Sequence, residues 1–442
     1  METELVLASI NAGISCWDLR SGAAQHAHFR SASSTPAHGL TSIDFADGNR
    51  VIAATHVREA KKSSGSVLYW TWNKHEPEVK SFLFEPILAL VSHSEAGYIV
   101  GGSKSGKIYI WEVSTGNLLT KWDAHLRAVT CLVFSDDKSL LISGSEEGGV
   151  RVWSLFMIFN EVQREQAKYI YEYSFSEHSL KVTDIAVGYG GCNAVILSSS
   201  EDHTCKIWSL SGRKLLRSVK FPSIIDAVAL DPVEHVFFAG GRDGKIYEAA
   251  LSAQVKLHHS YGEHIIRSSS EHSKAITCLK LSLDGRLLIS GSEDGMVRVW
   301  DTKTLHIIRV FRHDAKVSSP GPVSNVLVIS QPLPRTSVTS QAVSSRRHEL
   351  KPLKMSSDSP HENVKASLKS DDHTDYSNIC VQTLLQKQIK ELQQQGSSAA
   401  NGMETERVKL ELKETQQMNQ QWKRKFDDLY GLYVSEIMEG ST

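Results

Sequence analysis

Residues 140–153 read LLISGSEEGGVRVW, and residues 287–300 read LLISGSEDGMVRVW. The match extends upstream without a gap, to HLRAVTCLVFSDDKS starting at His125 and HSKAITCLKLSLDGR starting at His272. Nineteen of the 29 aligned positions are identical. A chain that repeats so long a stretch builds the same structural unit more than once, so this repeat decides the architecture.

Short β-rich runs that end on an aromatic residue mark the unit along the chain. They end at Trp17, Trp70, Trp111, Trp153, Trp208, Tyr247 and Trp300, at intervals of 53, 41, 42, 55, 39 and 53 residues. This spacing fits units of about 40 residues, some with insertions. Turn sequences such as SDDKS and EEGG separate the apolar runs, which predicts strands. One four-stranded sheet cannot bury both faces alone, but sheets packed around an axis can.

Polar residues recur at fixed spacing within the units, and their types fit a hydrogen-bonded lock inside a blade. An aspartate would accept from a histidine, the histidine would bond a serine, and the serine would accept from an indole N–H. Two units carry the full set: His272, Ser290, Asp294 and Trp300, and His178, Ser198, Asp202 and Trp208. Their spacing resembles that of the His–Ser–Asp–Trp network of WD repeats. Another unit has His125, Ser143 and Trp153, but glutamates occupy its turn, which we interpret as a lapse in the lock.

The motifs GSEDGMVRVWD and GSEEGGVRVW resemble those of WD-repeat proteins, over residues 1–330. The resemblance implies an all-β fold, a seven-bladed WD-repeat β-propeller. The chain begins with ELVLAS and ISCWDL, which read as the second and third strands of a blade without its first strand. Because VSNVLVIS at 323–330 has the length and pattern of the missing strand, we expect it to close the ring.

Composition changes after Ser330. Residues 331–376 are rich in serine, proline and charge, which predicts a flexible linker. Residues 377–438 return to helical spacing and predict a coiled-coil α-helical tail with a heptad seam over 408–433. Asn419 takes an a-type position, which favours paired helices in register. We expect partner contacts at Asn419, Trp422, Phe426, Leu429 and Tyr433; the alternative is that the helix packs on the propeller.

The stretch FMIFNEVQREQAKYIYEY at 156–173 is an insertion between the third and fourth strands of its blade. Phe156 and Phe159 are candidate partner contacts, because apolar residues on an outer loop often mark a binding surface. The alternative is a flap packed on its own blade.

Composition argues against several function classes. The 49 Lys and Arg balance 50 Asp and Glu, which gives no global attraction to nucleic acid or membrane. Six scattered cysteines without a CxxC pair indicate a reducing compartment. The start of the chain lacks the basic region of a signal peptide, and no apolar run approaches membrane length, so we expect a soluble intracellular protein.

No residue set predicts catalysis, a cofactor or a metal. The glycines of AGGRDG (239–244) and VGGSKSG (100–106) lie in strand turns rather than in a phosphate-binding loop. His258, His259 and His264 cluster near His272 but lack a metal-ligand spacing. The basic segments 58–62, 346–354 and 423–425 are not interleaved with aromatic residues, so direct RNA contact is unsupported. Residues 346–354 could act as a weak nuclear signal.

The whole layout, including WKRKFDDLYGLY in the tail, resembles the nuclear WD-repeat subunit of the complex that matures the large ribosomal subunit and processes the internal transcribed spacer. This resemblance implies a non-catalytic scaffold in the nucleolus and nucleoplasm. It implies two partners on pre-60S particles, a large helical-repeat scaffold protein and an AAA-type ATPase. The tail helix would pair two copies or clamp the scaffold protein.

A second function stays open on the motif WDLR. Trp17, Asp18 and Arg20 match the short WDxR core by which some WD-repeat proteins dock on a cullin–RING ligase adaptor as substrate receptors. The simpler interpretation is that Asp18 and Arg20 complete a blade edge.

Overall fold

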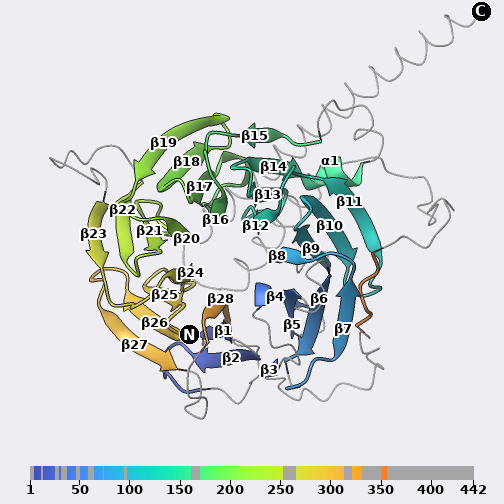
Figure 1. The fold of residues 1–442 in the computed structure, drawn as a ribbon, viewed down its shortest axis with the longest axis horizontal. Coiled ribbons are helices and arrows are strands. Elements are labelled where there is room, and N and C mark those ends of the chain that lie inside the picture. Colours follow the sequence, from blue (N-terminus) through green and yellow to red (C-terminus); the bar gives the residue numbers. More distant parts are fainter. Residues whose placement is uncertain are drawn as a thin grey trace, which may run out of the picture. The chain divides into compact units, whose positions relative to one another are not determined.

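Seven four-stranded antiparallel sheets form a ring in the computed structural model (Figure 1). The structure describes residues 4–10, 13–24, 29–30, 37–45, 50–57, 64–72, 74–93, 97–160, 170–251, 265–312, 321–330 and 350–355. All of these lie in the first of two compact units, Met1–Asp358; the second is Ser359–Thr442. Within the described residues, the expectation of an all-β, seven-bladed propeller is confirmed.

We number the blades along the chain and give each from its inner to its outer strand. Blade 1 is β28 (Val323–Ser330), β1 (Glu4–Ile10), β2 (Gly13–Asp18) and β3 (Phe29–Arg30). Blade 2 is β4 (Ala37–Asp44), β5 (Arg50–Val57), β6 (Gly65–Thr71) and β7 (Val79–Leu83). Blade 3 is β8 (Ile87–His93), β9 (Tyr98–Ser103), β10 (Lys107–Glu112) and β11 (Leu118–Asp123).

The other four blades follow the same order. Blade 4 is β12 (Val129–Phe134), β13 (Leu140–Ser145), β14 (Val150–Ser154) and β15 (Tyr173–Phe175). Blade 5 is β16 (Val182–Val187), β17 (Val195–Ser200), β18 (Thr204–Ser209) and β19 (Lys214–Lys220). Blade 6 is β20 (Ile225–Leu230), β21 (Val236–Gly241), β22 (Ile246–Ala250) and β23 (Ile265–Ser269). Blade 7 is β24 (Ile276–Leu281), β25 (Leu287–Ser292), β26 (Met296–Asp301) and β27 (Ile307–Arg312).

Burial along each strand follows from its place in the blade. The middle strand β13, LLISGS, is buried at every position because neighbouring blades cover both faces of its sheet. The outer strand β19, KLLRSVK, alternates between exposed and more buried positions, because one of its faces meets solvent. The inner strands contact one another in sequence around the axis, and β28 contacts both β24 and β4.

The last described strand of the propeller pairs with the first. β28 runs antiparallel to β1, from Glu4 opposite Ser330 to Ile10 opposite Val323. Hydrogen bonds from the neighbouring blades hold both of its ends. Thr277 of blade 7 donates to the Val323 carbonyl at 2.7 Å, and Arg50 of blade 2 donates to the Ser330 carbonyl.

A threonine near the start of the inner strand connects several blades to the next one. Thr130 donates to the Val182 carbonyl at 2.6 Å, and Thr183 donates to the Ile225 carbonyl at 2.7 Å. Thr277 makes the same contact from blade 7 to blade 1. The dipeptides VT at 129–130 and 182–183 and IT at 276–277 are the sequence signal from which these contacts could have been predicted.

Residues 155–160 of the insertion in blade 4 combine features of the two interpretations left open above, an exposed contact surface and a packed flap. Residues Leu155–Phe159 form a short helix, α1, and Ile158 is buried between blades 3 and 4. Phe159 packs against Tyr98 of β9, with ring centroids 5.5 Å apart. The apolar residues of this segment therefore divide between a packed side and an exposed side. A one-turn 3₁₀ helix, Gly191–Asn193, lies in blade 5.

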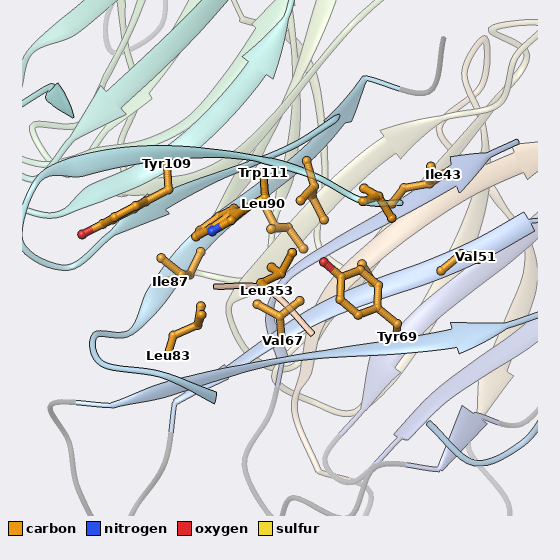
Figure 2. Close-up of a cluster of buried hydrophobic side chains, with 13 residues drawn as sticks. Ile43, Val51, Val67, Tyr69, Leu83, Ile87, Leu90, Tyr109, Trp111 and Leu353 are labelled. Atoms are coloured by element: carbon orange, nitrogen blue, oxygen red, sulfur yellow. The ribbon is translucent and has the colours of Figure 1, made fainter. Parts of the chain in front are cut away.

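The expectation of a flexible linker throughout 331–376 is wrong for residues 350–355. Leu353 is buried in the cluster that blades 2 and 3 share, beside Val67, Leu83, Ile87 and Leu90 (Figure 2). Serine, proline and charged residues dominate the composition of this region, so its average composition does not reveal the short apolar segment at 350–355. The rest of the predicted linker lies outside the described residues, as does the predicted helical tail 377–438 with its seam 408–433.

Candidate functional site

The recurring polar residues meet inside blades 5 and 7. In blade 7, His272 lies between Asp294 and Ser290, with Nδ1 2.9 Å from Asp294 Oδ2 and Nε2 2.7 Å from Ser290 Oγ. Trp300 Nε1 donates to the same Oγ at 2.8 Å. Blade 5 repeats this network, with distances of 2.9, 2.8 and 2.8 Å, through Asp202, His178, Ser198 and Trp208.

Blade 4 holds a complete lock, so the expected lapse is wrong. His125 Nδ1 lies 2.8 Å from Glu147 Oε1, and its Nε2 lies 2.8 Å from Ser143 Oγ. Trp153 Nε1 donates to Ser143 Oγ at 2.8 Å. Glu147 Oε2 also accepts from the backbone N–H of Leu126 at 3.0 Å. Glutamate therefore replaces the aspartate of the other two blades, four residues after the serine in each case.

Blades 6 and 3 use other partners. Tyr247 of blade 6 donates its hydroxyl to Asp243 Oδ2 at 2.6 Å, so the tyrosine takes the place of both indole and histidine. In blade 3, Trp111 donates its indole N–H to the carbonyl oxygen of Lys354 at 2.9 Å. The acceptor in blade 3 thus comes from a segment far along the chain.

Burial sets the protonation state of the lock residues. It lowers the pKa of His125 to about 4, against the hydrogen bond that His125 donates to Glu147, which acts to raise the pKa. Burial likewise lowers the pKa of His272. Burial alone would raise the pKa of Asp294, but hydrogen bonds from His272 and Arg298 hold it well below its usual range. Blades 4 and 7 therefore favour a neutral histidine, and in blade 7 the partner Asp294 stays charged.

We expect the free energy of unfolding to decrease as the pH falls from 6.5 toward 4. His125 ionises near 6.5 in the unfolded chain but only near 4 in the fold, so the unfolded state binds more protons in this window. Each such histidine contributes a slope of up to about 1.4 kcal/mol per pH unit. Urea unfolding at several pH values measures that slope. His125→Gln should reduce this slope. An unchanged slope would contradict the assignment of the pH dependence to His125.

This geometry suits structure rather than catalysis. The three lock histidine side chains have no exposed surface, so substrate cannot reach them. Within the described ranges, no group of three or more histidine, cysteine or acidic residues could hold a metal ion. His258, His259 and His264 lie outside the described residues, and His272 is used by its lock.

The candidate surface residues lie apart from the locks. Phe156 is 59% exposed and Phe159 is 42% exposed, so α1 presents both on the rim near blade 3. Trp17 is buried and stacks on Phe311 of β27, with centroids 5.3 Å apart. Asp18 accepts from the backbone N–H of Arg20 at 2.7 Å. Asn419, Trp422, Phe426, Leu429 and Tyr433 lie outside the described residues.

Comparison with known proteins relates this chain to WD-repeat proteins. Residues 116–154, 170–209 and 263–301 match the family "WD domain, G-beta repeat". The chain is 47% identical to Protein Root Initiation Defective 3 of Arabidopsis thaliana, over 100% of this chain and 99% of that protein. It is 36% identical to WD repeat-containing protein 18 of Bos taurus over 56% of each. It is 27% identical to Pre-rRNA-processing protein IPI3 of Yarrowia lipolytica, over 72% of this chain and 74% of that protein. Across the described ranges, no helix has the length and apolar character needed to cross a bilayer.

Proposed function

Since the chain belongs to the WD-repeat family of Root Initiation Defective 3, we propose that it is a non-catalytic scaffold subunit in pre-rRNA processing and large-subunit maturation. The observation that carries the proposal is the match to a protein named for pre-rRNA processing over 72% of the chain. The recurring histidines and serines hydrogen-bond to one another in the blade locks, which supports a non-catalytic role. A propeller then serves as a rigid platform for protein contacts.

The partners follow from the same proposal. The protein works in the nucleus, in the nucleolus and nucleoplasm, with a large helical-repeat scaffold protein and an AAA-type ATPase of the pre-60S complex. Phe156 and Phe159 offer a half-exposed aromatic pair on the rim, which suits a protein contact. The seam residues of the tail, with Trp422 and Phe426 at its aromatic end, contact the scaffold protein or a second copy of the chain.

A complementation experiment tests the proposal. Endogenous protein is depleted, and the full chain or its Trp422→Ala/Phe426→Ala variant is expressed with a tag. We expect the wild type to recover pre-60S factors and to restore the level of spacer-containing pre-rRNA. The variant should lose a subset of those factors, because aromatic anchors dominate binding energy at interfaces. An unchanged pre-rRNA pattern after depletion would contradict the proposed function.

The second candidate function is a substrate receptor of a cullin–RING ligase that docks through WDLR. Trp17 is buried, and Asp18 accepts from the backbone N–H groups of Arg20 and Ser21 at 2.7 and 3.1 Å. These contacts favour a turn role for Asp18 and leave Arg20 as the exposed residue of the motif. The same pull-down with Arg20→Ala separates the two functions. Loss of a cullin adaptor would support the receptor, and unchanged recovery of pre-60S factors would support the scaffold.

A further inference from the structure

The segment LKPLKM, residues 350–355, is bound on the propeller like a short peptide ligand. Leu353 is 5% exposed and inserts into the apolar cluster between blades 2 and 3 (Figure 2). Leu350 and Met355 pack on the edge of the same cluster. Lys351, Pro352 and Lys354 are exposed, so the segment buries one central leucine and keeps its charges in water.

Backbone hydrogen bonds fix the segment at three points. The N–H of Leu353 donates to Ser81 Oγ at 2.9 Å, and the N–H of Lys354 donates to the Gly116 carbonyl at 2.9 Å. The carbonyl of Lys354 accepts from Trp111 Nε1 at 2.9 Å. Two backbone N–H groups and one carbonyl of this segment are therefore matched by groups of blades 2 and 3, as expected for peptide recognition.

The site replaces a missing blade lock. Trp111 lies opposite Ile99, as Trp153 lies opposite Leu141, so Gly101 takes the place of the lock serine Ser143. A Cβ at Gly101 would lie 2.8 Å from the Trp111 ring, so a serine there would clash with the indole. Because glycine takes the position of the lock serine in blade 3, the indole N–H of Trp111 donates to the carbonyl of Lys354 instead.

The rim is also shaped for close approach of the peptide backbone. Gly116 has a φ of +71°, and a Cβ there would lie 2.3 Å from the Pro352 carbonyl oxygen. Glycine therefore supplies both the turn and the room for the segment. Pro352 fixes its own φ, which reduces the entropy that the segment loses on binding.

We propose that this rim surface of blades 2 and 3 is a peptide-binding site for an extended leucine- and lysine-containing segment, and that residues 350–355 of the same chain occupy it. The 19 residues of 331–349 (349 − 330) connect the segment to the end of β28. A connection of this length gives the segment an effective concentration on the order of millimolar, so modest affinity suffices to fill the site.

The test uses the full chain with Leu353→Asp, which empties the site, and a fluorescent peptide of sequence RRHELKPLKMSS, residues 346–357. Fluorescence anisotropy should show binding to the Leu353→Asp protein with an apparent Kd at least about tenfold lower than to the wild type, whose own segment competes. A peptide that carries Leu353→Asp is the matched control and should bind neither protein. Equal binding to both proteins, or to neither, would overturn the proposal.

Two further measurements guard against a folding defect and identify the occupant. In the wild-type full chain, the amides of Leu353 and Lys354 should exchange with deuterium at least about a hundredfold more slowly than in the free peptide, because both are hydrogen-bonded. If these two amides exchange at the rate of the free peptide, the proposal is wrong. Light scattering that shows a wild-type dimer which dissociates on Leu353→Asp would assign the occupant to a second copy and overturn binding within one chain.

Discussion

We expect Val326→Asp to open the ring and to cost about 4 kcal/mol or more of folding free energy, because it places an unpaired charge in an apolar core. Val326 is 4% exposed and lies in the cluster that blades 1 and 7 share, with Cys278, Ile289 and Val297. A Cβ added at Gly291 would lie 3.2 Å from a Val326 methyl group, so the packing on blade 7 leaves no room for water.

The consequence extends beyond local stability because β28 covers the edge of β1. Without β28, the N–H and carbonyl groups of β1 that face β28 would lose their partners and form an exposed strand edge, while those that face β2 would stay paired. Urea unfolding should show the lower stability, and light scattering should show association of the open rings. Val310→Asp is the matched control, since Val310 is 43% exposed on the outer strand β27, and it should cost less than about 1 kcal/mol. Equal effects of the two variants would contradict the assigned role of β28.

The sequence is most informative at positions that serve the same structural role in several blades, such as the tryptophans and the lock residues. The period of the tryptophans predicts the number of blades, because every blade presents the same two faces to its neighbours. The positions of His178, Ser198 and Asp202 could be predicted for the same reason. Glu147 could also have been recognised, since it follows Ser143 by the same four residues as Asp202 follows Ser198. Its longer side chain reaches the histidine from that position.

Contacts that occur in a single blade and do not recur in the others could not be predicted from the sequence. The docking of Leu353 depends on the absence of a side chain at Gly101 and on the turn at Gly116, and neither is visible in a pattern of apolar residues. Ile158 lies in an insertion of unusual length, where no repeat predicts which side chains turn inward. Unique contacts have no second copy in the chain to reveal them.

Trp300→Ala should be the most damaging change within a single blade, with a loss of about 3–5 kcal/mol. Trp300 is completely buried in the cluster between blades 6 and 7. Its removal leaves a large cavity, and it takes away the N–H that donates to Ser290 Oγ. The network through His272 to Asp294 then loses its inner end, which adds the cost of a weakened buried polar group.

Phenylalanine variants separate the packing of the indole from its hydrogen bond. Trp300→Phe and Trp122→Phe remove the same atoms from buried rings, but no described residue accepts from Trp122 Nε1. Trp300→Phe should therefore cost about 1–2 kcal/mol more than Trp122→Phe, because only the first breaks a lock. Chemical unfolding of the three variants and the wild type measures these differences. If the two phenylalanine variants are equally stable, the locks contribute by packing alone, and the hydrogen-bond network that links tryptophan, serine, histidine and aspartate does not explain why the four residues recur together.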